Sequence, residues 1–480
     1  MDQDAIELKR IALSGGVWSL ASAGVTALLS LGSSLLLARL LSPVDFGTYA
    51  MAMVVLDLFS SFTGLGIGMA MVQKQDITRE EISSTFWLYI FSSLAIFTVI
   101  AAISPLIAIS FNEPRISKLL PLVALSYVVG SAGYLYAWLL EKELAFILLA
   151  KQELFAALVA TSVTIILAFS GMGIWSLVWG YLTGHTLVSI LRVWACWSRW
   201  RPQLHFQWSD IRKFIRFGIY QMGEGALFNL GSRLDQLLIG WLLGVNVLGV
   251  YEFVAMRMLK PLGTISQILL RNAFPVLAKI QYDKTLLRQS FISLTKLLNN
   301  IEAPLLFGTG AVAPILIPVL FGKEWLQAVP LVPVLAAAQM FRRMNSQSGT
   351  LLMATGKPEL SFRWNLLLLL ASSIAIIPGA LYGGISGVAT AVLLTTVTGT
   401  IVGCFILIKP LLGKCGKELT AAILKPVLLS IIIGILVRLL AIHGNSSSSW
   451  LIITSTAGLA LYFGLLWTLD RNFVTVENEF

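Results

Sequence analysis

Basic and polar side chains recur at helical spacing along two apolar stretches in the second half of the sequence. The first stretch carries Arg257, Lys260, Thr264, Gln267 and Arg271. The second carries Gln339, Arg342, Arg343, Ser346 and Thr350. In regular helices each set would lie within an arc of about 80° to 100°. Guanidinium and ammonium groups gathered in this way predict a binding site for an anion such as phosphate.

The position of these cations in apolar sequence predicts that they face water and not lipid. An ionised side chain at mid-bilayer costs about 2.5–3.5 kcal/mol, so five of them would cost roughly 12–18 kcal/mol against acyl chains. An alternative remains open, strongest for Lys260, Arg271 and Lys296, in which the side chains extend to the inner membrane surface. It is weaker for Arg257, and weaker still for Arg342 and Arg343, which lie near the centre of their stretch.

Acidic residues inside apolar sequence form a second candidate site. Glu224 and Asp235 are about three turns apart on one helical face, and Arg233 lies on a neighbouring face. Asp57 is the main charge within an apolar stretch of the first half. A carboxylate beside a base in a membrane can bind a proton or Na⁺ and couple its movement to transport. The alternative is that Asp235 pairs with an arginine and fixes helix packing; both interpretations stay open.

The sequence contains none of the usual catalytic or nucleotide-binding patterns. It has no supported Ser/His/Asp or Cys/His set, no P-loop and no Gly-rich nucleotide turn after a strand. The three cysteines and three histidines lack ligand-like spacing, so neither a disulfide framework nor a metal site is expected. We therefore predict a protein that is not an enzyme, holds no cofactor, and draws on an H⁺ or Na⁺ gradient, the membrane potential or the gradient of its cargo.

The elements that must position these residues are membrane-spanning helices. Of the residues, 57% are hydrophobic and only 12% are charged, with a mean hydropathy of +0.84. Apolar stretches of about 20 residues, separated by short polar connections, predict an all-α polytopic protein with about fourteen spans. No cleavable signal peptide is expected. The predicted spans are 14–38, 46–72, 84–111, 119–140, 153–170, 174–196, 214–243, 247–275, 290–321, 328–354, 361–381, 384–408, 421–441 and 450–469.

The distribution of basic residues predicts the orientation. The net charge of +10 reflects 34 basic against 24 acidic residues. About 20 basic residues lie on the predicted inner side of the spans and about four on the outer side, which predicts that both termini are in the cytoplasm. This pattern argues against nucleic acid as a partner. Between residues 192 and 213, tryptophans alternate with arginines. We interpret that segment as an interfacial anchor, with a grip on cargo as the alternative.

The chain also repeats itself. Phe46-Gly47-Thr48-Tyr49 recurs as Leu248-Gly249-Val250-Tyr251, at an offset of 202, and Gly173-Ile174 recurs as Gly384-Ile385. Because the predicted repeats hold an even number of spans, they are parallel. We predict two pseudo-symmetric six-helix lobes, 1–200 and 201–412, a C-terminal helix pair, 413–480, and alternating access through a cleft between the lobes.

The residues from Leu37 to Tyr49, LARLLSPVDFGTY, resemble the LARLLxPxDFGxYA signature of Wzx-like polysaccharide exporters, in the multidrug/oligosaccharidyl-lipid/polysaccharide flippase superfamily. Weaker similarities cover nearly the whole chain and are strongest to the colanic-acid-exporter-like branch. They are found at Gly64–Gly66, Gln73–Thr78, Phe86-Trp87, Leu234–Gly240 and Leu351–Pro358.

This resemblance implies a flippase in the bacterial cytoplasmic membrane, working for exopolysaccharide, O-antigen or lipopolysaccharide synthesis. Its cargo would be an undecaprenyl-diphosphate-linked oligosaccharide. Arg257, Arg342 and Arg343 would hold the diphosphate, supported by Lys260 and Arg271. Asp235, Glu224, Arg233 and Asp57 would balance charge or couple an ion. We expect a monomer, with a polymerase and glycosyltransferases as possible partners.

Other functions fit part of the pattern. A lipid II flippase also suits a cationic interior and fourteen spans, and only the motif at 37–49 argues against it. A multidrug cation antiporter shares the two-lobe architecture but would need acidic or aromatic walls. A membrane polymerase or ligase usually needs a sizeable external loop, for which the chain has no room. A scaffold would not need intramembrane cations.

Overall fold

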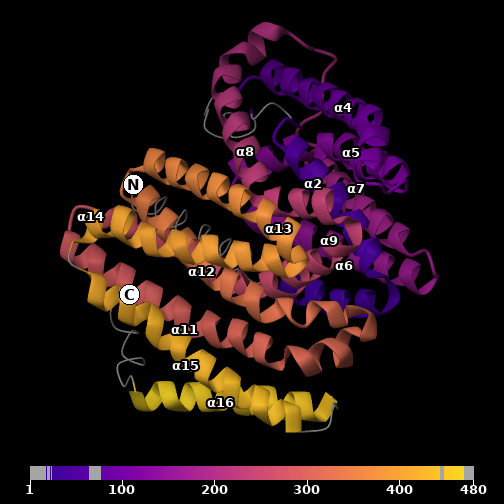
Figure 1. Ribbon diagram of the computed structural model, residues 1–480. Coiled ribbons are helices and arrows are strands. Elements are labelled where there is room, and N and C mark those ends of the chain that lie inside the picture. Colours follow the sequence, from indigo (N-terminus) through magenta and orange to yellow (C-terminus); the bar gives the residue numbers. More distant parts are fainter. Residues whose placement is uncertain are drawn as a thin grey trace. The chain divides into compact units, whose positions relative to one another are not determined.

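The computed structural model describes residues 18, 22, 24–63, 67, 77–413, 415–443 and 448–469. Every element assigned within these residues is a helix, which confirms the all-α fold class (Figure 1). The motif residues 64–66 and 73–76 and the start of the first predicted span lie outside the described residues.

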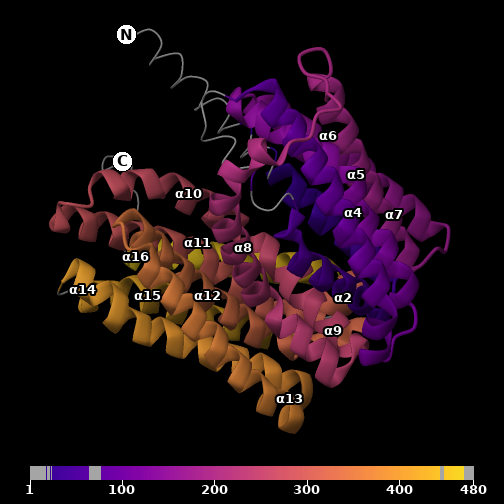
Figure 2. The same ribbon diagram turned by 90° about the horizontal axis from the view of Figure 1, so that it is seen from above.

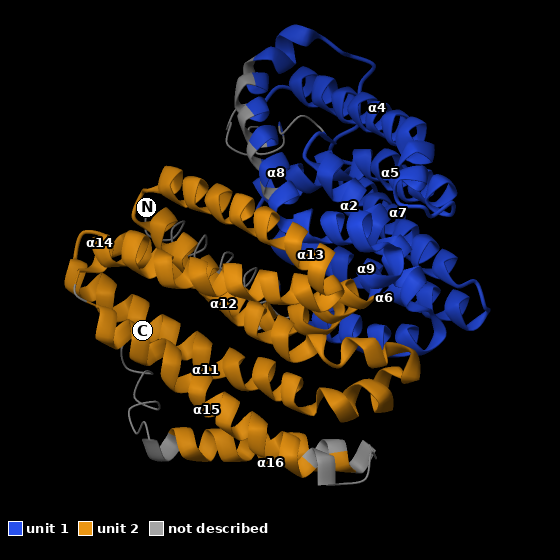
Figure 3. Cartoon of the chain, in the orientation of Figure 1, with its two compact units in different colours: residues 1–249 blue, residues 250–480 orange. Residues whose placement is uncertain are grey.

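The chain divides into two compact units, residues 1–249 and 250–480 (Figure 3). The first contains a helix at Gly24–Leu40 and then, in chain order, α2 (Pro43–Ser60), α4 (Arg79–Ser110), α5 (Ile116–Lys142), α6 (Phe146–Phe169), α7 (Ile174–Cys196), α8 (Trp208–Leu243) and most of α9 (Val245–Glu252). This division groups α8 with the preceding helices. The lobe boundary near residue 200, which follows the repeat and not compactness, stays a prediction.

The second unit is built around one long helix. Its elements are η2 (Phe253–Leu259), η3 (Lys260–Gly263), α10 (Thr264–Lys279), α11 (Lys284–Leu316), η4 (Ile317–Phe321), η5 (Lys323–Ala328), α12 (Leu331–Ala354), α13 (Pro358–Gly403), η6 (Cys404–Ile408), α14 (Lys409–Leu412), α15 (Gly416–His443) and α16 (Ser448–Leu469). Helix α11 packs against α12 and α15, and α12 packs in turn against α13 (Figures 1 and 2).

Local sequence explains where several helices begin. The hydroxyl of Ser42 accepts the backbone N–H of Asp45, and the carboxylate of Asp45 accepts the backbone N–H of Ser42. Pro43 occupies the first turn of α2, where its missing N–H costs nothing. Thr78 and Glu81 form the same reciprocal cap at the start of α4. The order of residues at 42–45 therefore has a local structural reason.

Most described helices overlap a predicted span, and α7 covers 174–196, as predicted. The boundaries differ elsewhere: α2 ends at Ser60, within the span predicted at 46–72, and α6 begins at Phe146, seven residues before its predicted start at 153. Seven described helices are long and apolar enough to cross a membrane, so the chain is a multi-pass membrane protein. The longest segment, Pro358–Leu412, covers two predicted spans and bends at Gly384, whose φ of 55° interrupts the helix. The count of fourteen spans and the cytoplasmic termini stay predictions.

Candidate functional site

The basic residues of the predicted eighth span lie at a break in the helix. Residues 253–259 form a π-helix, and residues 260–263 continue as a 3₁₀ helix before α10 begins. Pro261 explains the break, because proline lacks the N–H that would bond to the carbonyl of Arg257 and its ring clashes with that carbonyl. The assumption of a regular helix from Arg257 to Arg271 is therefore wrong, and the 80° arc does not apply across the break.

Arg343 joins this break to two other helices. Its Nη1 lies 2.6 Å from Oε1 of Glu302 on α11. Its Nη2 donates to the carbonyl oxygen of Leu259, at the junction of η2 and η3, over 3.2 Å. The guanidinium rests on Gly263, since a Cβ there would lie 2.0 Å from its Cζ. One side chain of α12 thus holds α11 and the broken segment together.

Glu302 is a residue that the sequence analysis missed. Its side chain is 1% exposed, and Oε2 has no hydrogen-bond partner among the described residues. An ionised carboxylate in such a place is costly unless it is paired. The sequence carried a signal, because Glu302 interrupts the same apolar stretch, 290–321, that contains Lys296.

Arg257 has a similar partner that sequence reasoning also missed. Its Nε lies 3.4 Å from Oε1 of Glu252, whose side chain is 9% exposed. Oε2 of Glu252 is buried without a hydrogen bond in the described part of the chain. Two of the three arginines predicted to hold an anion are therefore paired with carboxylates in this structure.

The remaining predicted cations are less completely placed. Lys260 is exposed at the start of η3, and Arg342 is half-buried on α12 next to Arg343. The backbone of Arg271 belongs to α10, but its side chain lies outside the described residues, as does that of Glu224 on α8. We call Arg257, Lys260, Arg342 and Arg343 the cationic cluster.

The predicted charge-balancing residues of the first unit form a polar seam between α2 and α8. Nε of Arg233 donates to Oδ2 of Asp57 over 2.7 Å. Nδ2 of Asn229 donates to the hydroxyls of Ser60 and Ser61 over 3.0 and 2.9 Å. The structure thus pairs Asp57 with Arg233, two residues that the sequence named together as charge-balancing without predicting their contact. We call these five residues the α2–α8 seam.

Asp235 lies beyond this seam and is 7% exposed. Its Oδ1 accepts the backbone N–H of Gln236. The neighbouring Gln236 accepts from Nη1 of Arg233 over 3.0 Å. Asp57, Arg233 and Gln236 are therefore linked in one chain of polar contacts.

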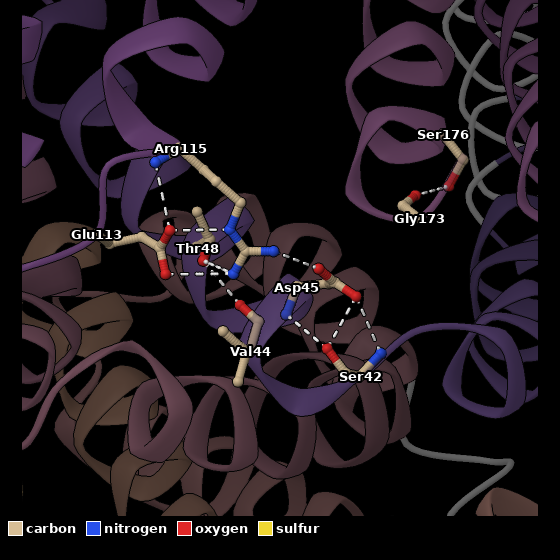
Figure 4. A network of polar contacts seen from close by, with 8 residues as sticks. All are labelled: Ser42, Val44, Asp45, Thr48, Glu113, Arg115, Gly173 and Ser176. Atoms are coloured by element: carbon tan, nitrogen blue, oxygen red, sulfur yellow. Dashed lines mark hydrogen bonds and ion pairs between the residues drawn. The ribbon is translucent and has the colours of Figure 1, made fainter. Parts of the chain in front are cut away.

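A second polar network lies at the start of α2 and includes Asp45 and Thr48 of the motif at 37–49. The guanidinium of Arg115, in the connection between α4 and α5, lies between the carboxylates of Asp45 and Glu113, 2.9 and 2.8 Å away (Figure 4). It also contacts the hydroxyl of Thr48. Hydrogen bonding from Arg115 lowers the pKa of Glu113. The aspartate of the motif therefore serves to anchor this connection.

The segment predicted as an interfacial anchor is partly a packing element. Nε1 of Trp87 donates to the carbonyl of Gln203 over 2.8 Å, and Trp200 is buried against Phe86 and Tyr136. Trp194, in contrast, is 79% exposed. An anchoring function stays a prediction for the exposed tryptophans only.

Such an arrangement can bind an anion but offers little for covalent chemistry. Guanidinium groups present forked donors that match phosphate oxygens. No group of three or more His, Cys, Asp or Glu side chains that could hold a metal ion occurs among the described residues. The chemistry available to the cationic cluster is electrostatic recognition.

Comparisons with known proteins identify the family of the chain. A family model described as "Polysaccharide biosynthesis protein" matches residues 36–330. The chain is 28% identical over 420 residues to the teichuronic acid biosynthesis protein TuaB of Bacillus subtilis (strain 168), covering 86% of this chain and 85% of that protein. It is 27% identical over 426 residues to the lipopolysaccharide biosynthesis protein WzxC of Escherichia coli (strain K12), covering 89% and 87%.

The fold is also similar to a solved structure. The lipid II flippase MurJ, in an inward closed conformation, matches with a TM-score of 0.76 over 95% of this chain and all of that chain, at 16% identity. At this identity the likeness concerns the fold alone.

Proposed function

Because the chain belongs to the family of polysaccharide biosynthesis proteins, within the Wzx-like exporters of the flippase superfamily, we propose that it moves a lipid-linked oligosaccharide from the inner to the outer leaflet. The proposed cargo is an undecaprenyl-diphosphate-linked oligosaccharide, and the proposed site is the bacterial cytoplasmic membrane. The protein is a transporter and not an enzyme.

The observation that carries the anionic cargo is the cationic cluster at the helix break. Arg257, Lys260, Arg342 and Arg343 lie on η2, η3 and α12, elements that are otherwise largely apolar. A diphosphate head group would complement them, and the prenyl chain could remain in lipid. Because Arg343 and Arg257 are paired with Glu302 and Glu252, binding must exchange these carboxylates for phosphate oxygens.

The experiment that tests the function is deletion of the gene in its host. We expect lipid-linked oligosaccharide to accumulate on the cytoplasmic side, and a plasmid copy of the gene to clear it. An unchanged pool of precursor in the deletion strain, with surface polysaccharide intact, would remove this assignment.

Transport of lipid II, the second candidate, is favoured only by the fold likeness to a lipid II flippase. Accumulation of peptidoglycan precursor in the deletion strain would support this second candidate. We also propose that the α2–α8 seam couples transport of the cargo to movement of H⁺ or Na⁺.

A further inference from the structure

We propose that Glu302 is the resident counter-ion of Arg343, which the phosphate of the cargo displaces, so that this carboxylate sets how tightly the protein binds its lipid. The inference rests on the proposed function and adds to it a residue that opposes binding. It concerns one contact, the 2.6 Å pair between Nη1 of Arg343 and Oε1 of Glu302.

Burial of Glu302 is the first reason. The carboxylate lies in the middle of α11 with 1% of its side chain exposed, and a lone ionised carboxylate there would be strongly unfavourable. Arg343 supplies the compensating charge. The arginine is itself needed by the cargo, so the two anions compete for one guanidinium.

Incomplete satisfaction of the pair is the second reason. Glu302 uses one oxygen, and Oε2 is buried with no hydrogen bond to any described residue. A guanidinium can bind an anion through two parallel hydrogen bonds. A diphosphate offers several acceptor oxygens, so it can form the fuller set of bonds that Glu302 does not form.

The third reason is that the guanidinium of Arg343 also contacts the broken segment between η2 and α10. Nη2 donates to the carbonyl of Leu259, and the group packs on Gly263, so Arg343 touches the broken segment at both of its junctions. Exchange of Glu302 for a phosphate would occur beside the 3₁₀ turn that carries Lys260. Displacement of the carboxylate therefore links cargo binding to the helix break.

The test measures binding of geranylgeranyl diphosphate to the full-length protein in detergent. In Glu302→Gln the side chain keeps its shape and loses its charge, so we expect affinity to rise about tenfold. The gain should vanish in Arg343→Gln/Glu302→Gln compared with Arg343→Gln. Glu418→Gln, which removes the counter-ion of Arg288 in an exposed pair of the same unit, should bind like wild type.

A structural pair would behave differently. If Glu302 only fastened helices, Glu302→Gln would unfold at lower temperature and bind the diphosphate no better, and that result would overturn the inference. An equal gain for uncharged geranylgeraniol, or no binding of the diphosphate by either protein, would overturn it too. If Glu302→Gln does not fold, Glu302→Asp is scored in the same way, because its shorter side chain withdraws from Arg343. Precursor accumulation in the deletion strain is independent of these outcomes, so failure here leaves the proposed function standing.

Discussion

Gly47 and Gly249 lie backbone to backbone, although 202 residues separate them. A Cβ on Gly47 would lie 1.7 Å from the carbonyl oxygen of Val245, and a Cβ on Gly249 would lie 1.8 Å from the carbonyl oxygen of Pro43. The same shift of 202 relates Pro43 to Val245. A contact that is reciprocal in this way is characteristic of a local two-fold relation, here between the segments 43–47 and 245–249 of the first unit.

A second pair of repeat-related glycines has matching backbones. Gly173 has φ 54° and ψ −134°, and Gly384 has φ 55° and ψ −141°. Each begins an apolar helix that starts with isoleucine. Gly173 and Gly384 therefore form equivalent turns at positions that the predicted parallel repeats make equivalent.

The glycine crossing should not tolerate a side chain. We expect Gly47→Ala and Gly249→Ala each to destabilise the protein by about 1–3 kcal/mol, because the new methyl group meets a backbone oxygen that cannot move away cheaply. Thermal unfolding of the solubilised protein measures this. Gly32→Ala is the matched control, since no atom lies within 4 Å of its Cβ; a loss in the control as large as at Gly47 would contradict the account.

The bend at Gly384 should depend on its backbone conformation. Gly384→Ala places a side chain in the left-handed region and should cost about 1–3 kcal/mol. Its neighbour Gly383 has open space around it and no such φ, so Gly383→Ala should be close to neutral. Melting temperatures of the two variants decide the matter, and equal values would refute the strain.

The Glu113–Arg115 pair should make stability depend on acidity. Because the pKa of Glu113 is lowered, its contribution is fully present above the unfolded value of about 4.3 and is lost as pH falls through the folded pKa. Glu113→Gln should therefore be less stable than wild type by about 1 kcal/mol near neutrality, given the partial exposure of Arg115. The difference should shrink below about pH 4, and a difference constant over this range would count against the pair.

Asp57 and Arg233 should act as one unit. We expect Asp57→Asn and Arg233→Gln each to reduce complementation of the deletion strain, and the double variant to be no worse than the worse single one, because partners in contact are non-additive. Glu143→Gln, which breaks an exposed pair with Arg199, should complement fully. Losses that simply add would show that the two residues act separately.

Much of the fold could be predicted because hydrophobic length and helix capping are local properties. The span at 174–196 follows from an apolar run that begins directly after Gly173. The turn at Gly384 follows in the same way from a glycine that precedes an apolar run. The break at Pro261 follows from the presence of proline alone. A helical wheel does not show it, because the wheel assumes a regular helix. The candidate site was harder to predict, because tertiary packing decides which charged side chains form ion pairs.

The missed carboxylates illustrate this. A helical wheel places Arg343 on one face of its own helix. It cannot show that Glu302, 41 residues away in the sequence, contacts the Arg343 side chain. Likewise, Asp57 is an isolated charge in the sequence around it, and only the packing of α2 against α8 places Arg233 beside it. Counting cations in apolar sequence predicted an anionic cargo, which stays a prediction, but it did not predict that the chain itself places carboxylates beside Arg257 and Arg343.

The central claim is that cations on η2, η3 and α12 recognise the phosphate of a lipid cargo, and transfer in reconstituted vesicles tests it most directly. The assay compares a fluorescent undecaprenyl-diphosphate oligosaccharide with the same oligosaccharide on an uncharged lipid. We predict movement between leaflets for the diphosphate alone, abolished when Arg257, Arg342 and Arg343 are all replaced by glutamine in a folded protein. Equal transfer of both lipids, or undiminished transfer by the triple variant, would contradict the account.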